Sequence, residues 1–125
     1  MIWTLSQVAI GGAIGSVARF ATVMGMTRLL GEGFPYGTAL VNVAGSFVMG
    51  AVFLTLAERQ AMQHAPFLMA GVLGGFTTFS AFSLDAVRLW ERGDGMLAVG
   101  YVMGSVLLSI AALLFGMTAA KMVTT

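Results

Sequence analysis

Four long stretches almost free of charge constrain what this chain can fold into. Residues 33–57, 60–84 and 95–120 contain no Asp, Glu, Lys or Arg, and residues 3–30 form a fourth stretch that Arg19 interrupts. About 20 apolar residues in a helix cross the hydrocarbon core of a bilayer, and longer stretches can tilt. The pattern therefore predicts an all-α membrane protein with four transmembrane helices.

The composition leaves no room for a soluble domain. Of the 125 residues, 58% are hydrophobic and 9% are charged, whereas an average soluble domain has about 25% charged residues. We expect residues 1–125 to form a single four-helix domain, with no signal peptide. The net charge of +1 gives no support to nucleic-acid binding, and the absence of cysteine excludes disulfides and thiolate metal sites.

Turn-forming residues set the expected helix ends. Gly31 is a natural end for the first span, Pro35 cannot continue a helix, and Pro66 suits the first turn of the third span. The expected spans are residues 5–30, 38–57, 66–92 and 96–121. Small residues four apart predict close packing between membrane helices, and these pairs are Gly11/Gly15, Ser46/Gly50, Gly71/Gly75 and Gly100/Gly104.

The third span carries a predicted break at residues 74–78, where the sequence is Gly-Gly-Phe-Thr-Thr. At about 1.5 Å per residue from Pro66, this segment lies roughly 12 to 18 Å into a core about 30 Å thick. Non-helical backbone persists in lipid only where protein or a water-filled cavity satisfies its polar groups. Transport proteins bind ions at such broken helices, so we predict an ion site here.

The predicted break frees polar groups of both kinds. Carbonyl oxygens of Gly74 and Thr77 would suit a small hard cation, and N–H groups at the start of the second half would suit an anion. The alternative is a glycine kink that serves packing, with the threonine hydroxyls bonded to the preceding turn.

Phe79 and Phe82 are three residues apart and share a helix face, with Ser80 beside them. Aromatic pairs on membrane helices usually pack against neighbours. An aromatic ring also has a positive edge, which can face a small anion without the strong trapping that a buried Lys or Arg would cause. Conduction requires binding weak enough for the ion to leave.

Two further polar features lie inside the apolar spans. Asn42 is the one asparagine of the chain; its amide can bond between helices or donate to an anion. Tyr101, Ser105 and Ser109 recur every four residues and form a polar stripe that stops at Leu113. The stripe suits either a hydrogen-bonding track for an ion or contacts between helices.

Arg19 is the one basic residue well inside a span, and an intramembrane charge usually faces a cavity. We expect it to line an anion vestibule, the alternative being an arginine that extends to the interface. Near the end of the third span, Asp85, Arg88, Glu91 and Arg92 have the spacing of ion pairs within a helix. No Ser-His-Asp set, metal-ligand cluster or phosphate loop is present, so we expect no enzyme.

Charge gives almost no preferred orientation in the membrane. Arg28, Arg88 and Arg92 flank one side, whereas Arg59 and Lys121 flank the other. With three basic residues on one side and two on the other, the positive-inside rule gives almost no preference for either orientation. A chain that inserts both ways can pair with its own inverted copy, and the alternative is a single orientation set by something other than loop charge.

Three motifs of the chain resemble those of the Fluc (CrcB) fluoride channel family. They are residues 11–19 (GGAIGSVAR), Gly37-Thr38 with Asn42 and Gly45, and residues 74–83 (GGFTTFSAFS). The resemblance covers the whole chain in length, number of spans and order of motifs, and the third motif is the most specific.

The resemblance implies a passive fluoride channel in the cell (inner) membrane, crossing the bilayer several times. It implies an antiparallel, dual-topology homodimer with two fluoride pores and a central structural sodium ion (Na+) that is not transported. Fluoride would leave the cytoplasm down its electrochemical gradient.

The resemblance also assigns roles to residues of this chain. The carbonyls of Gly74 and Thr77 match the ligands of the sodium ion. Leu113 departs from a hydroxyl position found in some members of the family. The expected residues of the fluoride pore are Asn42, Phe79, Ser80, Phe82, Tyr101, Ser105 and Ser109.

Two other classes of function compete with a channel. Small multidrug exporters also have four spans and inverted dimers, but they resemble one another in a membrane-embedded glutamate on the first helix. Residues 5–30 contain no Asp or Glu here. A non-transporting scaffold protein would not need the break, Asn42 and the polar stripe together.

Overall fold

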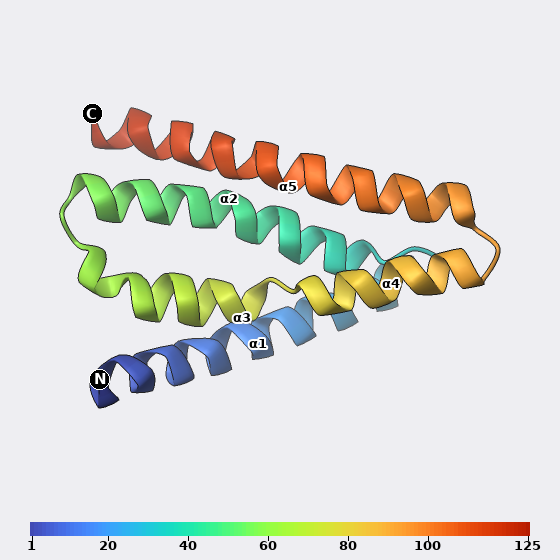
Figure 1. Cartoon of the computed structure of the whole chain (residues 1–125), viewed down its shortest axis with the longest axis horizontal. Helices are drawn as coiled ribbons and strands as arrows, with labels where there is room; N and C mark the ends of the chain where they lie inside the picture. The colour runs from blue at the N-terminus through green and yellow to red at the C-terminus, as the bar shows by residue number, and fades with distance from the viewer.

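The computed structural model describes all 125 residues, as four long helices of which the third is interrupted. Figure 1 shows a bundle with both termini and the η1 connection at one end and the other two connections at the opposite end. Each helix is long and apolar enough to cross a membrane, which confirms the predicted class of fold. The elements are α1 (Ile2–Leu30), α2 (Tyr36–Glu58), η1 (Met62–His64), η2 (Pro66–Leu73), α3 (Gly74–Phe76), α4 (Phe79–Glu91) and α5 (Gly95–Thr124).

The helix ends lie close to the predicted ones. Helix α1 stops before Gly31, whose φ of 82° is in the region that favours glycine and whose N–H donates to the Thr27 carbonyl at 2.8 Å. Helix α2 begins two residues earlier than predicted, and α5 extends to Thr124. Both extensions lie in flanking residues that hydropathy alone does not assign to a span.

The third span departs from a simple bent helix. Its first part, η2, is a π-helix, and Gly74 and Gly75 remain helical in α3. The break is confined to Thr77 (φ −91°, ψ 158°) and Thr78 (φ −152°, ψ 123°), which are both extended. The predicted break at residues 74–78 was thus too wide, because β-branched threonine favours extended backbone while the glycines serve helix packing.

Glycine allows α1 to lie directly against the third span. A Cβ atom added at Gly15 would overlap the carbonyl oxygen of Val72, and one added at Gly11 would lie 2.6 Å from the Phe67 carbonyl oxygen. Backbone contact of this kind is how membrane helices associate when lipid supplies no hydrophobic drive. The pair Gly100/Gly104 does not behave this way, since nothing in the chain lies within 4 Å of an added Cβ there.

Helices α2 and α5 form a second close seam. An added Cβ at Gly50 would overlap the Leu113 carbonyl oxygen, and one at Gly116 would overlap the Phe47 carbonyl oxygen. Because the backbones touch here, no space remains between these two helices beyond this level.

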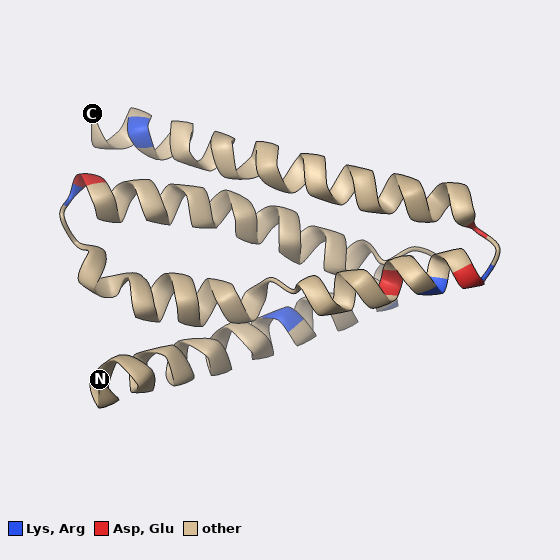
Figure 2. Cartoon of the chain, viewed as in Figure 1, with Lys and Arg blue, Asp and Glu red and all other residues tan.

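Most charged residues lie toward the two ends of the bundle (Figure 2), whereas Arg19 and Asp85 lie within helices α1 and α4. At one end Arg92 pairs with Asp94 (Nε to Oδ2, 3.0 Å) and donates through Nη2 to the Gly33 carbonyl at 2.6 Å. This is the one ion pair of the chain, so the pairs expected within α4 do not form. Arg92 instead links the connection between α4 and α5 to the connection between α1 and α2.

Gly15→Ala is expected to destabilise the protein by about 1–3 kcal/mol, because the new methyl group cannot fit without moving α1 away from Val72. The measurement is the midpoint of thermal unfolding in detergent, followed by size-exclusion chromatography. Gly12→Ala is the matched control on the same helix, since nothing lies within 4 Å of its added Cβ. Equal midpoints for the two variants would contradict this packing.

Candidate functional site

The Asn42 side chain holds the break open. Its Nδ2 donates to the Thr78 carbonyl at 3.0 Å, and its Oδ1 accepts from the Thr78 N–H at 2.8 Å. One amide thus satisfies both backbone groups of an extended residue, as a neighbouring strand would. The structure therefore uses Asn42 as a contact between helices and leaves one of its two amide hydrogens for another partner.

Arg19 contacts the other side of the break. Its Nε donates to the Gly75 carbonyl at 2.9 Å. In a continuous helix this carbonyl would accept from the N–H of Phe79, four residues later. Arg19 replaces that donor, and the rest of its guanidinium makes no hydrogen bond within the chain.

Two carbonyls at the break lose their helical donors. The N–H of Thr78 would bond to Gly74 in a continuous helix but bonds to Asn42 instead. The N–H of Ala81 would bond to Thr77 but is capped by the Thr78 hydroxyl at 3.2 Å. The Gly74 and Thr77 carbonyls are therefore free to act as ligands, which is what a hard cation requires.

The threonine hydroxyls at the break both form hydrogen bonds within the chain. The Thr77 hydroxyl bonds to the Leu73 carbonyl in the preceding turn at 2.9 Å, as the kink interpretation predicted. Thr78 caps α4. No group of three His, Asp or Glu side chains is placed to hold a metal ion, so backbone oxygen is the cation-binding chemistry available at the break.

A cavity of about 270 Å³, which we call the break cavity, lies beside this segment. It brings together five of the predicted pore residues from three helices, and none of its lining residues is charged. Ser80, Tyr101 and Arg19 do not line it. The lining residues are Asn42, Ser46, Thr77, Thr78, Phe79, Phe82, Ser105, Val106, Ser109 and Ile110.

The two phenylalanines of the site have very different exposure. Their ring centroids are 5.5 Å apart with an interplanar angle of 51°, which confirms that they share a face. Phe82 is 7% exposed and packs against Tyr101, whereas Phe79 is 77% exposed. A large ring left this open marks a surface that another molecule covers, lipid or protein.

Tyr101 lies outside the lining of the break cavity, and its hydroxyl donates to Asp85 Oδ2 at 3.3 Å. Its ring contacts Phe82 with centroids 5.1 Å apart. Ser80 is exposed, with its hydroxyl 3.5 Å from that of Thr78. Of the predicted polar stripe, only Ser105 and Ser109 reach the cavity.

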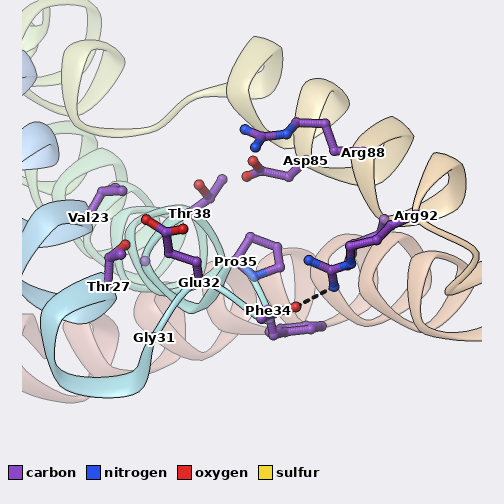
Figure 3. A pocket seen from close by; sticks show the side chains of 13 residues that line it. Val23, Thr27, Gly31, Glu32, Phe34, Pro35, Thr38, Asp85, Arg88 and Arg92 are labelled. Atoms are coloured by element: carbon purple, nitrogen blue, oxygen red, sulfur yellow. Dashed lines mark hydrogen bonds between the residues drawn. The ribbon is translucent and has the colours of Figure 1, made fainter.

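Asp85 also lines a second cavity of about 260 Å³ near the connection after α1, which we call the loop cavity (Figure 3). Carboxylates and guanidinium groups both face it: Glu32 and Asp85 on one hand, Arg88 and Arg92 on the other. Tyr101 bonds to a residue of the loop cavity and packs on a residue of the break cavity, and so lies between the two.

Sequence reasoning missed three residues of this region. Ser46 lines the break cavity, Thr78 receives the Asn42 contact, and Asp85 accepts from Tyr101. Ser46 was detectable, because it follows Asn42 by four residues and so shares its helix face. The other two contacts depend on how separate helices meet.

Known proteins resemble this chain along its whole length. The sequence model of the family described as CrcB-like protein, Camphor Resistance (CrcB), matches residues 6–117. The fluoride-specific ion channel FluC of Cereibacter sphaeroides is 57% identical over 121 residues, which are 97% of each chain. The protein of that name from Paracoccus denitrificans is 52% identical over 118 residues, 94% of each chain. That from Ruegeria sp. is 53% identical over 127 residues and covers both chains entirely.

Asn42→Leu is expected to destabilise the protein by roughly 2–5 kcal/mol, because it leaves both backbone groups of Thr78 without a partner. Faster hydrogen exchange at residues 77–79, measured by mass spectrometry, should accompany the loss. Asn42→Asp is the informative comparison, since it keeps the acceptor for the Thr78 N–H and removes the donor. Unchanged exchange in Asn42→Leu would contradict the proposed contact.

Proposed function

This chain belongs to the CrcB-like family, and we propose that it is a fluoride-specific ion channel whose pore passes through the break cavity. The observation that carries this proposal is the lining of that cavity. An amide, two aromatic rings and three serine hydroxyls converge on it, and no charged side chain does. Its relatives are channels rather than enzymes.

The chemistry of the lining supports passage of a small anion. Neutral O–H and N–H donors and the positive edges of Phe79 and Phe82 stabilise an anion without holding it. A buried lysine or arginine in the same place would bind it too strongly to release it. We assign Asn42, Phe79, Phe82, Ser105 and Ser109 to the pore wall, with Ser80 and Tyr101 at its ends.

A proton-coupled exporter is the weaker alternative. Such a mechanism requires an acidic group inside the membrane that binds a proton and substrate in turn. Helix α1 contains no Asp or Glu, and no carboxylate lines the break cavity. The site is therefore suited to passive conduction, in which fluoride that has accumulated in the cytoplasm leaves down its own gradient.

We propose that the carbonyls of Gly74 and Thr77 hold a structural sodium ion. Both have lost their helical donors, and carbonyl oxygens are ligands that hard cations prefer. Two ligands from one chain are too few to enclose a cation. Two copies related by a two-fold axis at the break would offer four.

An inverted homodimer is therefore our proposal for the working unit in the cell (inner) membrane. The exposed Phe79 ring supports it, because a second copy would cover the open side of the break cavity. The similar numbers of basic residues at the two ends support insertion in both orientations (Figure 2). Arg19, which uses only its Nε at Gly75, has further donors for an anion vestibule.

Purified protein in liposomes is expected to release fluoride passively and to reject chloride strongly. A fluoride electrode and a chloride electrode measure the two effluxes from liposomes that contain no other protein. Equal rates for the two ions would overturn the proposed function. So would a fluoride efflux that requires a proton gradient.

Phe79→Ile and Phe82→Ile are each expected to reduce fluoride efflux by more than tenfold while the dimer still assembles. Isoleucine keeps apolar bulk but has no ring edge, whereas a residue that only packs would lose little on this exchange. Phe115→Ile is the control, since this ring lies on α5 outside the cavity and is 69% exposed. Normal fluoride efflux in both variants would contradict a role for the ring edges and would indicate that Phe79 and Phe82 serve only packing.

Replacing sodium by a large organic cation is expected to lower fluoride efflux and to shift the protein from dimer to monomer in detergent. No sodium current should accompany fluoride, since the ion is structural. Thr77→Ser should retain the response because the ligand is a backbone carbonyl. A dimer whose thermal stability is the same with and without sodium would contradict this site.

A further inference from the structure

Ser46 adds a hydrogen-bond donor from α2 to the lining of the break cavity. It lies one helical turn after Asn42 on α2, and both side chains line the cavity. Ser105 and Ser109 line the same cavity from α5. Donors therefore converge on this space from two different helices, whereas the polar stripe in the sequence places hydroxyls on one helix alone.

The Ser46 hydroxyl is free to bind a ligand. Serine and threonine in apolar helices commonly bond to the carbonyl four residues earlier, and six hydroxyls of this chain do so: Ser6, Thr22, Thr77, Ser83, Thr118 and Thr125. Ser46 makes no such bond, and neither do Ser105 and Ser109. These three serines all line the break cavity; Ser16 and Thr55, elsewhere in the chain, also make no such bond.

The seam between α2 and α5 gives Ser46 a particular place in the cavity. Gly50 and Leu113, where the two backbones touch, lie one turn beyond Ser46 and Ser109 respectively. These two serines are therefore the last donors on their helices before the space between α2 and α5 closes. Ser46 and Ser109 therefore both line the break cavity next to this seam, one from each helix.

We infer that Ser46 is a fluoride-binding residue of the pore, paired across the cavity with Ser109. The inference rests on the proposed function. Fluoride sheds water only where donors replace that water on more than one side. Ser105 and Ser109 supply hydroxyls from α5, and Asn42 has only one amide hydrogen left to supply from α2. Ser46 supplies the opposing donor at the point where the ion must leave the track.

The test is fluoride efflux from liposomes at several fluoride concentrations, for wild type, Ser46→Ala, Ser46→Val and Ser46→Thr. Valine and threonine have the same shape, so this pair differs only in the hydroxyl. We expect Ala and Val to slow efflux roughly tenfold, the effect of losing one hydrogen bond to an ion, and to raise the half-saturating fluoride concentration. Threonine should restore wild-type behaviour to within about threefold.

Ser6→Ala is the matched control, because the Ser6 hydroxyl is bonded to its own helix at the Ile2 carbonyl. Wild-type efflux in Ser46→Val would overturn the inference and leave the proposed function standing. Equal losses in Ser46→Val and Ser46→Thr, with no change in the half-saturating concentration, would assign Ser46 to packing and overturn it as well. A wild-type protein that releases no fluoride would instead reject the proposed function itself.

Discussion

The double hydrogen bond between Asn42 and Thr78 is the contact on which the rest of the structure depends. A helix crossing lipid cannot be interrupted unless every freed backbone group finds a partner. Asn42 supplies both partners of Thr78 at once, which leaves the Gly74 carbonyl without its helical donor. Phe79, the first residue of α4, lines the break cavity directly after this contact. Without the amide, the N–H of Thr78 would be unpaired in an apolar environment, which would favour its bond to the Gly74 carbonyl and a continuous helix.

Close packing of α1 against the third span allows a second contact at the break, between Arg19 and Gly75. Gly11 and Gly15 bring the backbone of α1 against the third span, so the Arg19 side chain can reach the Gly75 carbonyl. A charge inside the membrane is costly, and here part of that cost is offset by a backbone acceptor that would otherwise be unpaired. The arginine and the interrupted helix therefore stabilise each other, which explains why a single basic residue lies at mid-membrane.

The site separates cation chemistry from anion chemistry over a few residues. Free carbonyls lie on the α3 side of the break, and neutral donors with two aromatic rings lie in the cavity on the α4 side. Neither half is complete in one chain, since two carbonyls do not enclose a cation and the Phe79 ring is left open. In the homodimer that we propose, a second copy of the chain would complete both sites.

The sequence by itself determined the four spans, the interruption in the third and five of the residues that line the cavity, because hydropathy, glycine and helical spacing are local properties. It did not determine what each polar group bonds to. Asn42 and Thr78 are 36 residues apart, and Arg19 and Gly75 are 56 apart, so their pairing exists only once the helices are packed. For the same reason the packed structure moved the break to Thr77 and Thr78, removed Tyr101 from the cavity lining and added Ser46 to it.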